Sequence, residues 1–315
     1  GFDYGVYLHS TSHSVLSGNN VTNNMHGFRL DVSSDNSIYE NNVASNWRGI
    51  MLLSSNYNTL IANNITANTW MGIYVYYSSS HNRIIGNNIT ANDEGIFLSY
   101  SSCHNTVAEN NITASVVFGV SLGDSSNYNS IFRNLITDNQ YGVMINSSNK
   151  TAVTRNTVSN SYYGISFIHS GDSTVTANEI SNNQAGVLLA TSSENNTVVG
   201  NNILNNYFGL YQWESSNNFI FHNNFKDNFL QVYDISWHPS HPGSPSINTW
   251  DDDYPSGGNY WSNYADVDLY SGLNQDIVGS DGIWDHVYTI DSNNRDRYPL
   301  IEPWSTPAMI KVLIR

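Results

Sequence analysis

The chain has 315 residues, of which 11 are Lys or Arg and 26 are Asp or Glu, so its formal net charge is −15. Such an acidic chain lacks the basic surface that binding to nucleic acids or anionic membranes requires. No run of 18 or more apolar residues is present to span a bilayer, and the single cysteine, Cys103, excludes a disulfide within the chain.

From its first residues onward, the chain repeats a short phrase of glycine, an apolar residue, any residue and a second apolar residue. The interval between copies is 22 to 24 residues. A period of this length predicts a solenoid. The phrase begins at Gly5, Gly27, Gly49, Gly72, Gly95, Gly119, Gly142, Gly164, Gly186 and Gly209.

Each repeat contains short runs that alternate apolar and polar residues and favour Ile, Val, Tyr and Thr, as residues 72–92 show. The runs are separated by Ser, Asn and Gly, and none has the spacing of an amphipathic helix. A leucine-rich repeat is excluded because its leucine ladder is absent. We therefore predict an all-β fold: a right-handed parallel β-helix of about ten coils, with three short strands in each coil.

An asparagine follows each of these glycines by 14 or 15 residues. Stacked coils would place these side chains above one another, so we expect each amide to donate to the next and form a structural ladder. The ladder residues are Asn19, Asn41, Asn63, Asn87, Asn110, Asn134, Asn156, Asn178, Asn201 and Asn223.

Two further columns are predicted to be structural. A second asparagine column, which begins at Asn24 and Asn46, is expected to occupy turns in the left-handed conformation. The glycine column is expected to mark a tight bend whose backbone conformation a Cβ atom would oppose.

Aromatic residues recur beside the glycines and are predicted to form a stripe along one side of the solenoid. Such a stripe indicates an interface or a binding surface, because flat rings stack on sugar faces. Cover by the C-terminal tail, contact with another subunit and glycan binding all remain open. The stripe includes Trp47, Trp70, Tyr74, Phe97, Phe118, Tyr141, Tyr163, Phe208 and Tyr211.

Seven Asn-x-Ser/Thr sequons make N-glycosylation a candidate modification. Four of them share one position of the repeat. The acidity, the scarcity of lysine and the abundance of Asn, Ser and Tyr favour an extracellular protein at the cell surface. The sequons are at Asn20, Asn64, Asn88, Asn111, Asn146, Asn149 and Asn195.

The Gly-Ile-x-Leu, Ser-Ser-x-Asn-Thr-Ile and Asn-Asn-Ile phrases of residues 1 to about 230 resemble the NosD-like β-helix repeats, also described as carbohydrate-binding and sugar-hydrolase domains. The resemblance implies the fold. It does not imply one activity, because lyases, hydrolases, epimerases and inert surface proteins share that fold. NosD proteins are tied to copper-site maturation, yet no recognisable copper motif is present.

The tail is predicted to be a separate part of the molecule. Pro239, Pro242 and Pro245 interrupt the repeat, so we expect a β-helix over 1–230 and a capping segment over 231–304. A last apolar strand is expected over 305–315. The Asp/Trp-rich part of the tail is similar to a segment of archaeal surface proteins, which implies an archaeal cell-surface origin.

Carboxylates in the tail make calcium a candidate cofactor, because calcium takes six to eight oxygen ligands. The alternative is that these residues form solvated turns. The candidate ligands are Asp266, Asp268, Asp276, Asp281 and Asp285.

No catalytic residues are assigned. Asp93 and Glu94 lack a third acid nearby, and the basic residues of the coils are scattered. His81 and His104 share one rung of adjacent coils, so they are expected about 5 Å apart, as a weak metal pair or as turn residues.

The sequence therefore favours a non-catalytic cell-surface solenoid that associates with its own copies or with other surface proteins and contacts polysaccharide. We expect association to pair 305–315 with the first coil of a neighbour. The alternative is that the chain is a fragment whose missing parts cover that coil. Alternative functions are a polysaccharide hydrolase, lyase or epimerase, and a carbohydrate-binding module.

Overall fold

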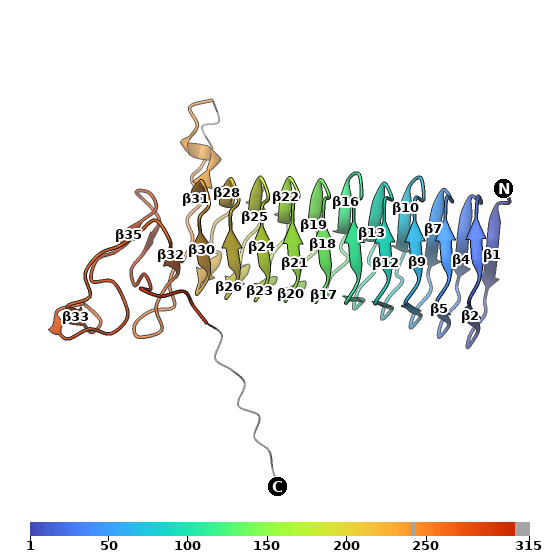
Figure 1. The fold of residues 1–315 in the computed structure, drawn as a ribbon, viewed down its shortest axis with the longest axis horizontal. Helices are drawn as coiled ribbons and strands as arrows, with labels where there is room; N and C mark the ends of the chain where they lie inside the picture. The colour runs from blue at the N-terminus through green and yellow to red at the C-terminus, as the bar shows by residue number, and fades with distance from the viewer. Residues whose placement is uncertain (241–242, 306–315) are drawn as a thin grey trace, which may run out of the picture.

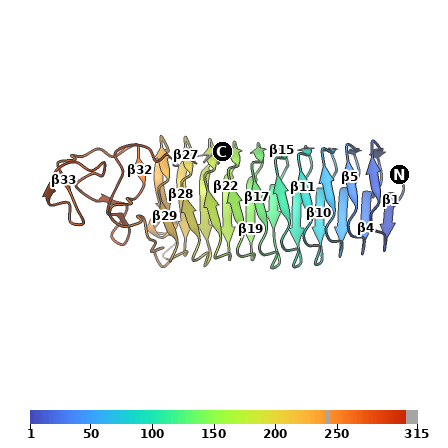
Figure 2. The same ribbon diagram turned by 90° about the horizontal axis from the view of Figure 1, so that it is seen from below.

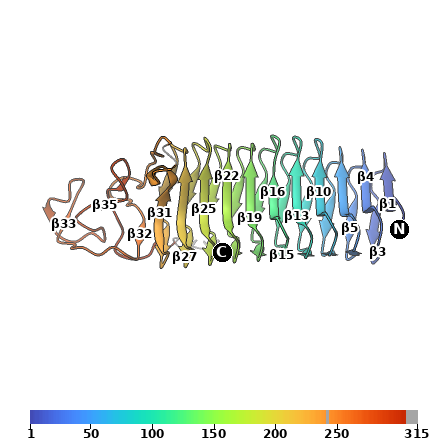
Figure 3. The same cartoon turned by 90° about the horizontal axis from the view of Figure 1, so that it is seen from above.

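The computed structural model describes residues 1–240 and 243–305 and confirms the predicted β-helix. Figure 1 shows the coils stacked along one axis, and Figures 2 and 3 show the same stack from below and from above. Three parallel sheets, here named A, B and C, run the length of the stack because each coil contributes one strand to each sheet.

Sheet A contains the longest strands, each of five or six residues, and includes the repeated glycines. Its eleven strands are β1 (Tyr4–His9), β4 (His26–Asp31), β7 (Arg48–Leu53), β10 (Met71–Tyr76), β13 (Glu94–Ser99), β16 (Phe118–Leu122), β19 (Tyr141–Asn146), β22 (Tyr163–Ile168), β25 (Ala185–Ala190), β28 (Phe208–Trp213) and β31 (Leu230–Asp234).

Sheets B and C are built mainly from three-residue strands. Sheet B contains β2 (Val15–Ser17), β5 (Ser37–Tyr39), β8 (Thr59–Ile61), β11 (Arg83–Ile85), β14 (Thr106–Ala108), β17 (Ser130–Phe132), β20 (Ala152–Thr154), β23 (Thr174–Thr176), β26 (Thr197–Val199) and β29 (Phe219–Phe221). Sheet C contains β3 (Asn20–Thr22), β6 (Asn42–Ala44), β9 (Asn64–Thr66), β12 (Asn88–Thr90), β15 (Asn111–Thr113), β18 (Leu135–Thr137), β21 (Thr157–Ser159), β24 (Glu179–Ser181), β27 (Asn202–Leu204), β30 (Asn224–Lys226) and β32 (Tyr260–Trp261).

The interior is a column of aliphatic side chains with polar ladders at the corners. Ile73, Val75, Ile84 and Ile89 of one coil are all fully buried, and their equivalents in the other inner coils are buried too. Each side chain stacks on the same position of the next coil. A full coil buries about four such residues, which makes apolar burial the main stabilising contribution of every repeat.

The predicted asparagine ladder is continuous in the structure. From Asn19 to Asn223, each side-chain Nδ2 donates to Oδ1 of the next asparagine at 2.9–3.0 Å. The backbone N–H of each ladder residue donates to that same oxygen, as Asn87 does to Asn110. These bonds satisfy amides that burial would otherwise make costly.

The conformations predicted for the second asparagine column and for the glycine column are wrong. The asparagines of the second column are inward-facing ladder residues, as Asn46 and Asn68 show, and the positive φ belongs to the residue before each of them, such as Ser45 (φ 55°). The glycine column is required by close approach. A Cβ atom on Gly49 would lie 2.4 Å from the carbonyl oxygen of Gly72, whereas neither of these glycines has a positive φ.

The tail covers the C-terminal end of the solenoid, beyond the last coil at the left of Figure 1. Its strand β32 pairs in parallel with β30 and extends sheet C. Trp261 stacks between Phe225 of the last coil, at 4.6 Å, and Tyr288, at 4.3 Å between ring centroids. The tail also contains η1 (Ile235–Trp237) and two antiparallel pairs, β33 (Tyr270–Ser271) with β34 (Ile277–Val278), and β35 (Tyr288–Thr289) with β36 (Arg295–Asp296).

Of the predicted terminal strand 305–315, all but Ser305 lies outside the described residues. Its pairing therefore stays a prediction. Within the described ranges, no helix is long and apolar enough to cross a membrane.

Candidate functional site

The outer face of sheet A has three columns of outward-facing side chains. The apolar residue after each glycine points into the core, as Ile73 does, whereas the residue before the glycine lies on the outer face, as Met71 does. These two residues are two positions apart, so the alternation of a regular strand is interrupted at the glycine, whose own Cβ position faces inward. We call the residue before each glycine the first column. The second and third columns lie two and four residues after the glycine, as Tyr74 and Tyr76 do after Gly72.

The structure brings the predicted aromatic stripe onto this face. Phe118, Tyr141, Tyr163 and Phe208 belong to the first column, and Tyr74, Phe97 and Tyr211 belong to the second. Trp47 and Trp70 come directly before the first column, at the turn into sheet A. Most of the described tail lies beyond the last coil (Figure 1). Trp304 returns to stack on His222, between sheets B and C, and Trp237 contacts Tyr233 of β31, the last strand of sheet A.

The C-terminal half of the face contains an apolar hollow of about 220 Å³. A small residue contributes to this hollow, since Ala190 lies in the third column between the larger side chains of Ile168 and Trp213. Burial raises the pKa of Tyr163 to about 12, so its hydroxyl is a neutral hydrogen-bonding group. The lining residues are Tyr141, Tyr163, Ile168, Leu188, Ala190, Thr191, Tyr211 and Trp213.

The N-terminal half of the face forms a second apolar cluster outside the main core. Met51, Met71 and Tyr74 are buried there, although they point away from the solenoid interior. Their neighbours Trp70 and Phe97 shield them, with Phe97 stacked on Tyr74 at 5.5 Å. Side chains on this face therefore hold one another in fixed positions, as a rigid binding surface requires.

Charged residues occupy the same columns in the first coils. Arg29 Nε donates to both carboxylate oxygens of Asp31, at 2.8 and 3.0 Å, and the Tyr7 hydroxyl donates to Asp31 Oδ2 at 3.1 Å. Partial burial and the nearby Asp31 carboxylate raise the pKa of Tyr7. The hydroxyl also lies 3.4 Å from His9 Nδ1. A carboxylate, a phenol and an imidazole therefore lie together in the first two coils, with the Asp31 carboxylate buried and the Tyr7 phenol exposed.

Sequence reasoning missed Arg48, which it treated as one of several scattered arginines. Its signal was its place in the repeat, directly before Gly49 and therefore in the first outward column. Glu94 was noted but not placed with Arg48 in that column. Burial, and then the neighbouring Asp93, raise the pKa of Glu94.

The candidate calcium residues do not form one cluster. Asp266 accepts from His286 Nδ1 at 2.6 Å, Asp268 accepts from the backbone of Asp281, and Asp285 accepts from the backbone of Leu269. Within 1–240 and 243–305, no group of three or more His, Cys, Asp or Glu side chains is placed to hold a metal ion.

His81 and His104 lie as close as their rung position predicts. Their ring centroids are 5.0 Å apart and their planes differ by 4°. Tyr57 and Tyr128 extend the stack on either side, at 4.9 and 5.0 Å. Parallel rings direct their nitrogen lone pairs side by side, so the pair does not converge on one ion.

Four sequons lie on the outer surface of sheet C, where Asn20, Asn64, Asn88 and Asn111 share one column with Asn42. Their amides form an exterior ladder, as between Asn88 and Asn64 at 2.8 Å. The other three sequons, at Asn146, Asn149 and Asn195, lie at or after the ends of sheet A strands.

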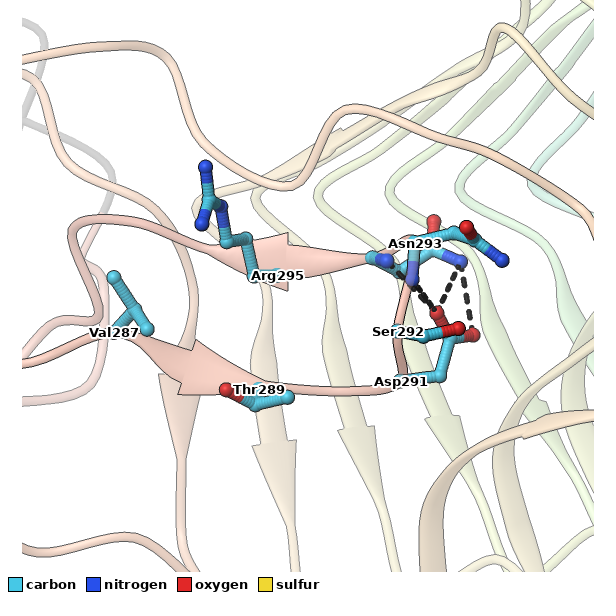
Figure 4. A pocket seen from close by; sticks show the side chains of 7 residues that line it. Val287, Thr289, Asp291, Ser292, Asn293 and Arg295 are labelled. Atoms are coloured by element: carbon cyan, nitrogen blue, oxygen red, sulfur yellow. Dashed lines mark hydrogen bonds between the residues drawn. The ribbon is translucent and has the colours of Figure 1, made fainter.

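A hollow of about 460 Å³ lies at the turn between β35 and β36 (Figure 4). Its groups are engaged with one another, because Asp291 Oδ1 accepts from the backbone N–H groups of Asn293 and Asn294 at 2.6 and 2.8 Å. It is a structural turn of the cap, and we take the aromatic outer face of sheet A as the candidate site.

Comparison with known proteins agrees with the repeat. The chain matches the family described as "Periplasmic copper-binding protein (NosD)" over residues 1–117 and 101–266. The chain belongs to this family. No curated protein matches it.

Several solved structures share the fold. The structural alignment with the periplasmic alginate epimerase AlgG covers 73% of this chain and 66% of AlgG, with 17% identity and a TM-score of 0.53. For the Azotobacter vinelandii mannuronan C-5 epimerase AlgE4 A-module the shares are 70% and 76%, with 14% identity and a TM-score of 0.56. For the catalytic domain of a GH87 α-1,3-glucanase in complex with tetrasaccharides they are 76% and 54%, with 11% identity and a TM-score of 0.56. The chain spans less than two thirds of two of these proteins, and the likeness shows the fold alone.

Copper, which the family description implies, does not fit the described residues. They contain no group of three His, Cys, Asp or Glu ligands, and the rings of His81 and His104 are parallel. Cys103 is engaged in the turn, where its Sγ accepts from the backbone of Asn127 at 3.3 Å. No role of this chain is therefore derived through copper.

Proposed function

We propose that this protein binds polysaccharide along the outer face of sheet A. The observation that carries the proposal is the apolar hollow between Tyr163 and Tyr211, which has rings on both sides and an open front. Aromatic faces stack on the C–H face of a sugar, and the phenolic hydroxyls supply hydrogen bonds at its edge. Ligand sites of this kind are mostly apolar, with few polar groups.

The length of the face suits an extended polymer. The outward columns repeat with every coil, at the spacing of about 4.8 Å between parallel strands, so successive sugars would meet similar surroundings. Three proteins of the same fold support the class of ligand, since the names of two describe alginate or mannuronan epimerases and the third is in complex with tetrasaccharides. The family description and such ligands support an extracytoplasmic location.

Binding of the intact chain to a glycan array, followed by calorimetry with the best ligand, tests the proposal. Replacing Tyr211 by Ala should weaken binding by about tenfold or more, since a buried stacking residue in a binding site costs more than 1 kcal/mol when truncated. Tyr128→Ala is the matched control, because Tyr128 belongs to the His81–His104 stack away from sheet A. Equal affinities of the two variants, or no glycan bound, would contradict the proposal.

A second candidate is a polysaccharide-acting enzyme, favoured by Tyr7, His9 and Asp31 on the same face. These residues provide groups that accept and donate protons next to the Arg29 guanidinium. Turnover of a bound glycan by the wild type, lost in Asp31→Asn, would favour this candidate. Unchanged glycans after prolonged incubation would leave binding as the function.

Self-association is also a proposal. It is supported by the N-terminal coil, in which β1, β2 and β3 each pair with one neighbouring strand within the described residues.

A further inference from the structure

The guanidinium of Arg48 lies over the rings of Trp47 and Trp70 on the outer face of sheet A. Its Cζ atom is 4.0 Å from the ring centroid of Trp47 and 4.2 Å from that of Trp70. Tyr74 contributes a third ring at 5.6 Å. The two indoles contact each other, with centroids 4.9 Å apart. Cation–π contacts with two adjacent rings hold the guanidinium in place.

Arg48 has no carboxylate partner in the described part of the chain. Arg29, Arg133 and Arg297 each form an ion pair with an Asp or Glu, but no carboxylate oxygen lies within 4.0 Å of an Arg48 nitrogen. Its Nε atom is buried and has no hydrogen-bond acceptor. Burial of a charged donor without an acceptor is costly. The side chain as a whole is only partly buried, and its terminal nitrogens are not among the buried unpartnered atoms, so an acceptor from outside the chain would meet those nitrogens.

The residue next to Arg48 in the first column, His26, also has a buried nitrogen without a hydrogen-bond partner. His26 pairs with Arg48 across the strands, is 2% exposed, and has no partner at its buried Nδ1. Its ring is 6.1 Å from that of Trp47 in an edge-on contact. Burial, followed by the charges of Arg48 and Arg29, lowers the pKa of His26 to about 4. At neutral pH the imidazole is therefore uncharged, and Arg48 is the local charge.

Glu94, two coils further along the same column, also has a buried oxygen, Oε2, without a partner. Two coil spacings separate the two residues by about 9.6 Å. Burial and the neighbouring Asp93 raise the pKa of Glu94, and the Trp70 side chain opposes this rise. Unpartnered polar groups therefore recur along the column from coil two to coil five.

We propose that His26, Arg48, Trp47 and Trp70 form a subsite for a carboxylate-bearing sugar, a uronic acid residue of a polysaccharide. This inference rests on the proposed function and names the class of sugar at one part of the same face. The carboxylate receives charge-assisted hydrogen bonds from the fixed guanidinium, and the sugar ring packs on the indoles.

A carboxylate suits the electrostatics of the molecule. The net charge of −15 repels polyanions at long range. Close to the subsite, Asp31 is neutralised by Arg29, so the unpaired charge of Arg48 dominates. Salt screens the long-range repulsion more than the short contact with a guanidinium held against two indoles, so binding survives moderate ionic strength.

Calorimetry with the intact chain and four-residue oligogalacturonate and oligomannuronate tests the inference, with their carboxyl-reduced forms as neutral matches. We expect at least one acid to bind about tenfold or more tightly than its reduced form, as expected for hydrogen bonds to a charged group. Arg48→Gln should abolish that preference. Arg83→Gln, which removes the same charge from an exposed position on sheet B, should retain it.

A preference that persists in Arg48→Gln, or a wild type that binds acid and reduced forms equally, would overturn the inference. Tighter binding of a sulfated oligosaccharide than of both uronates would also overturn it. If Arg48→Gln fails to fold, as judged by circular dichroism, Arg48→Lys serves instead and should lose most of the preference because it cannot bind in a bidentate manner. If the chain binds neutral glycans and shows no preference for acidic ones, the uronic acid subsite is wrong but the proposed function holds. If the chain binds no glycan at all, both the subsite and the proposed function are wrong.

Discussion

Asn223 and Asn259 are 36 residues apart in the sequence, yet the Asn223 Nδ2 donates to the Asn259 Oδ1 at 3.0 Å. Asn259 belongs to the tail and occupies the next rung of the main asparagine ladder. The Asn259 backbone N–H in turn donates to the buried carboxylate of Asp296 at 2.7 Å. The ladder therefore ends on a tail carboxylate, which makes the cap continuous with the solenoid.

The first prediction concerns the interior of that ladder. Replacing Asn110 by Leu removes the acceptor of the Asn87 backbone and side chain, at 2.9 and 3.0 Å, and leaves the Ile84 carbonyl without its donor. Unsatisfied buried groups cost about 1–3 kcal/mol each, so we expect a loss of at least that size in the free energy of unfolding. Urea denaturation measures it. Thr113→Ser, at a partly exposed position of the next strand, is the control and should change almost nothing; equal losses would contradict the ladder's role.

Much of this architecture was predictable because the repeat samples one environment ten times. Asparagines such as Asn63 and Asn87 recur at a nearly fixed distance from the repeated glycines, too regularly for chance, so the ladder was visible in the sequence. Two other ladders were missed. One begins at Asn36 and Asn58, and the other, at Ser33 and Ser55, uses hydroxyls. Ser and Asn are also common in turns, so composition alone did not show that these residues face inward.

The tail was less predictable because it contains no repeat. Asn259 continues the ladder from a segment whose spacing to Asn223 breaks the period, and Asp296 gave no sequence signal of its burial. The subsite around Arg48 was missed for another reason. Its residues come from three successive coils, and the ion pairs that the other arginines form, but Arg48 does not, are visible only in the folded chain.

The second prediction is a pH dependence caused by Asp296. Burial raises the pKa of Asp296 to about 7, although it accepts from the Trp261 indole at 2.9 Å. The folded chain therefore retains a proton between about pH 4 and 7 that the unfolded chain releases. The contribution of Asp296 to the free energy of unfolding is fully present below the pKa that this carboxyl has in the unfolded chain. It is lost as the pH rises through about 7.

Thermal unfolding followed by tryptophan fluorescence from pH 4 to 8 measures the effect. We expect the melting temperature of the wild type to fall with rising pH relative to that of Asp296→Asn, whose side chain does not titrate. Asp291→Asn is the control, since Asp291 lies in the β35–β36 turn. Parallel curves for the wild type and Asp296→Asn would show that this carboxyl does not titrate in the window.

Calcium binding by the tail is the third prediction. It rests on the sequence spacing of Asp266, Asp268, Asp276, Asp281 and Asp285 alone, because the described structure does not bring three such carboxylates together around one ion. An ion that binds the folded state alone raises the melting temperature by mass action. Calcium should therefore raise it, a chelator should reverse the change, and Asp268→Asn should weaken the response. If neither the melting curve nor the tryptophan fluorescence changes when calcium or chelator is added, these residues only form solvated turns.

The last prediction is association through residues 305–315. The backbone groups on the free side of β1 have no strand partner within the described residues, and an apolar strand rich in Ile, Val and Leu is suited to pair there. A contact between the end of one copy and the first coil of another is heterologous, so it propagates into a filament. Deleting 305–315 should abolish large assemblies in analytical ultracentrifugation while circular dichroism retains the β signal. Lysine at Ile310, Val312 and Ile314 should have the same effect without shortening the chain. Assemblies that persist in both variants, or an intact chain that stays monomeric at high concentration, would exclude the end-to-end contact.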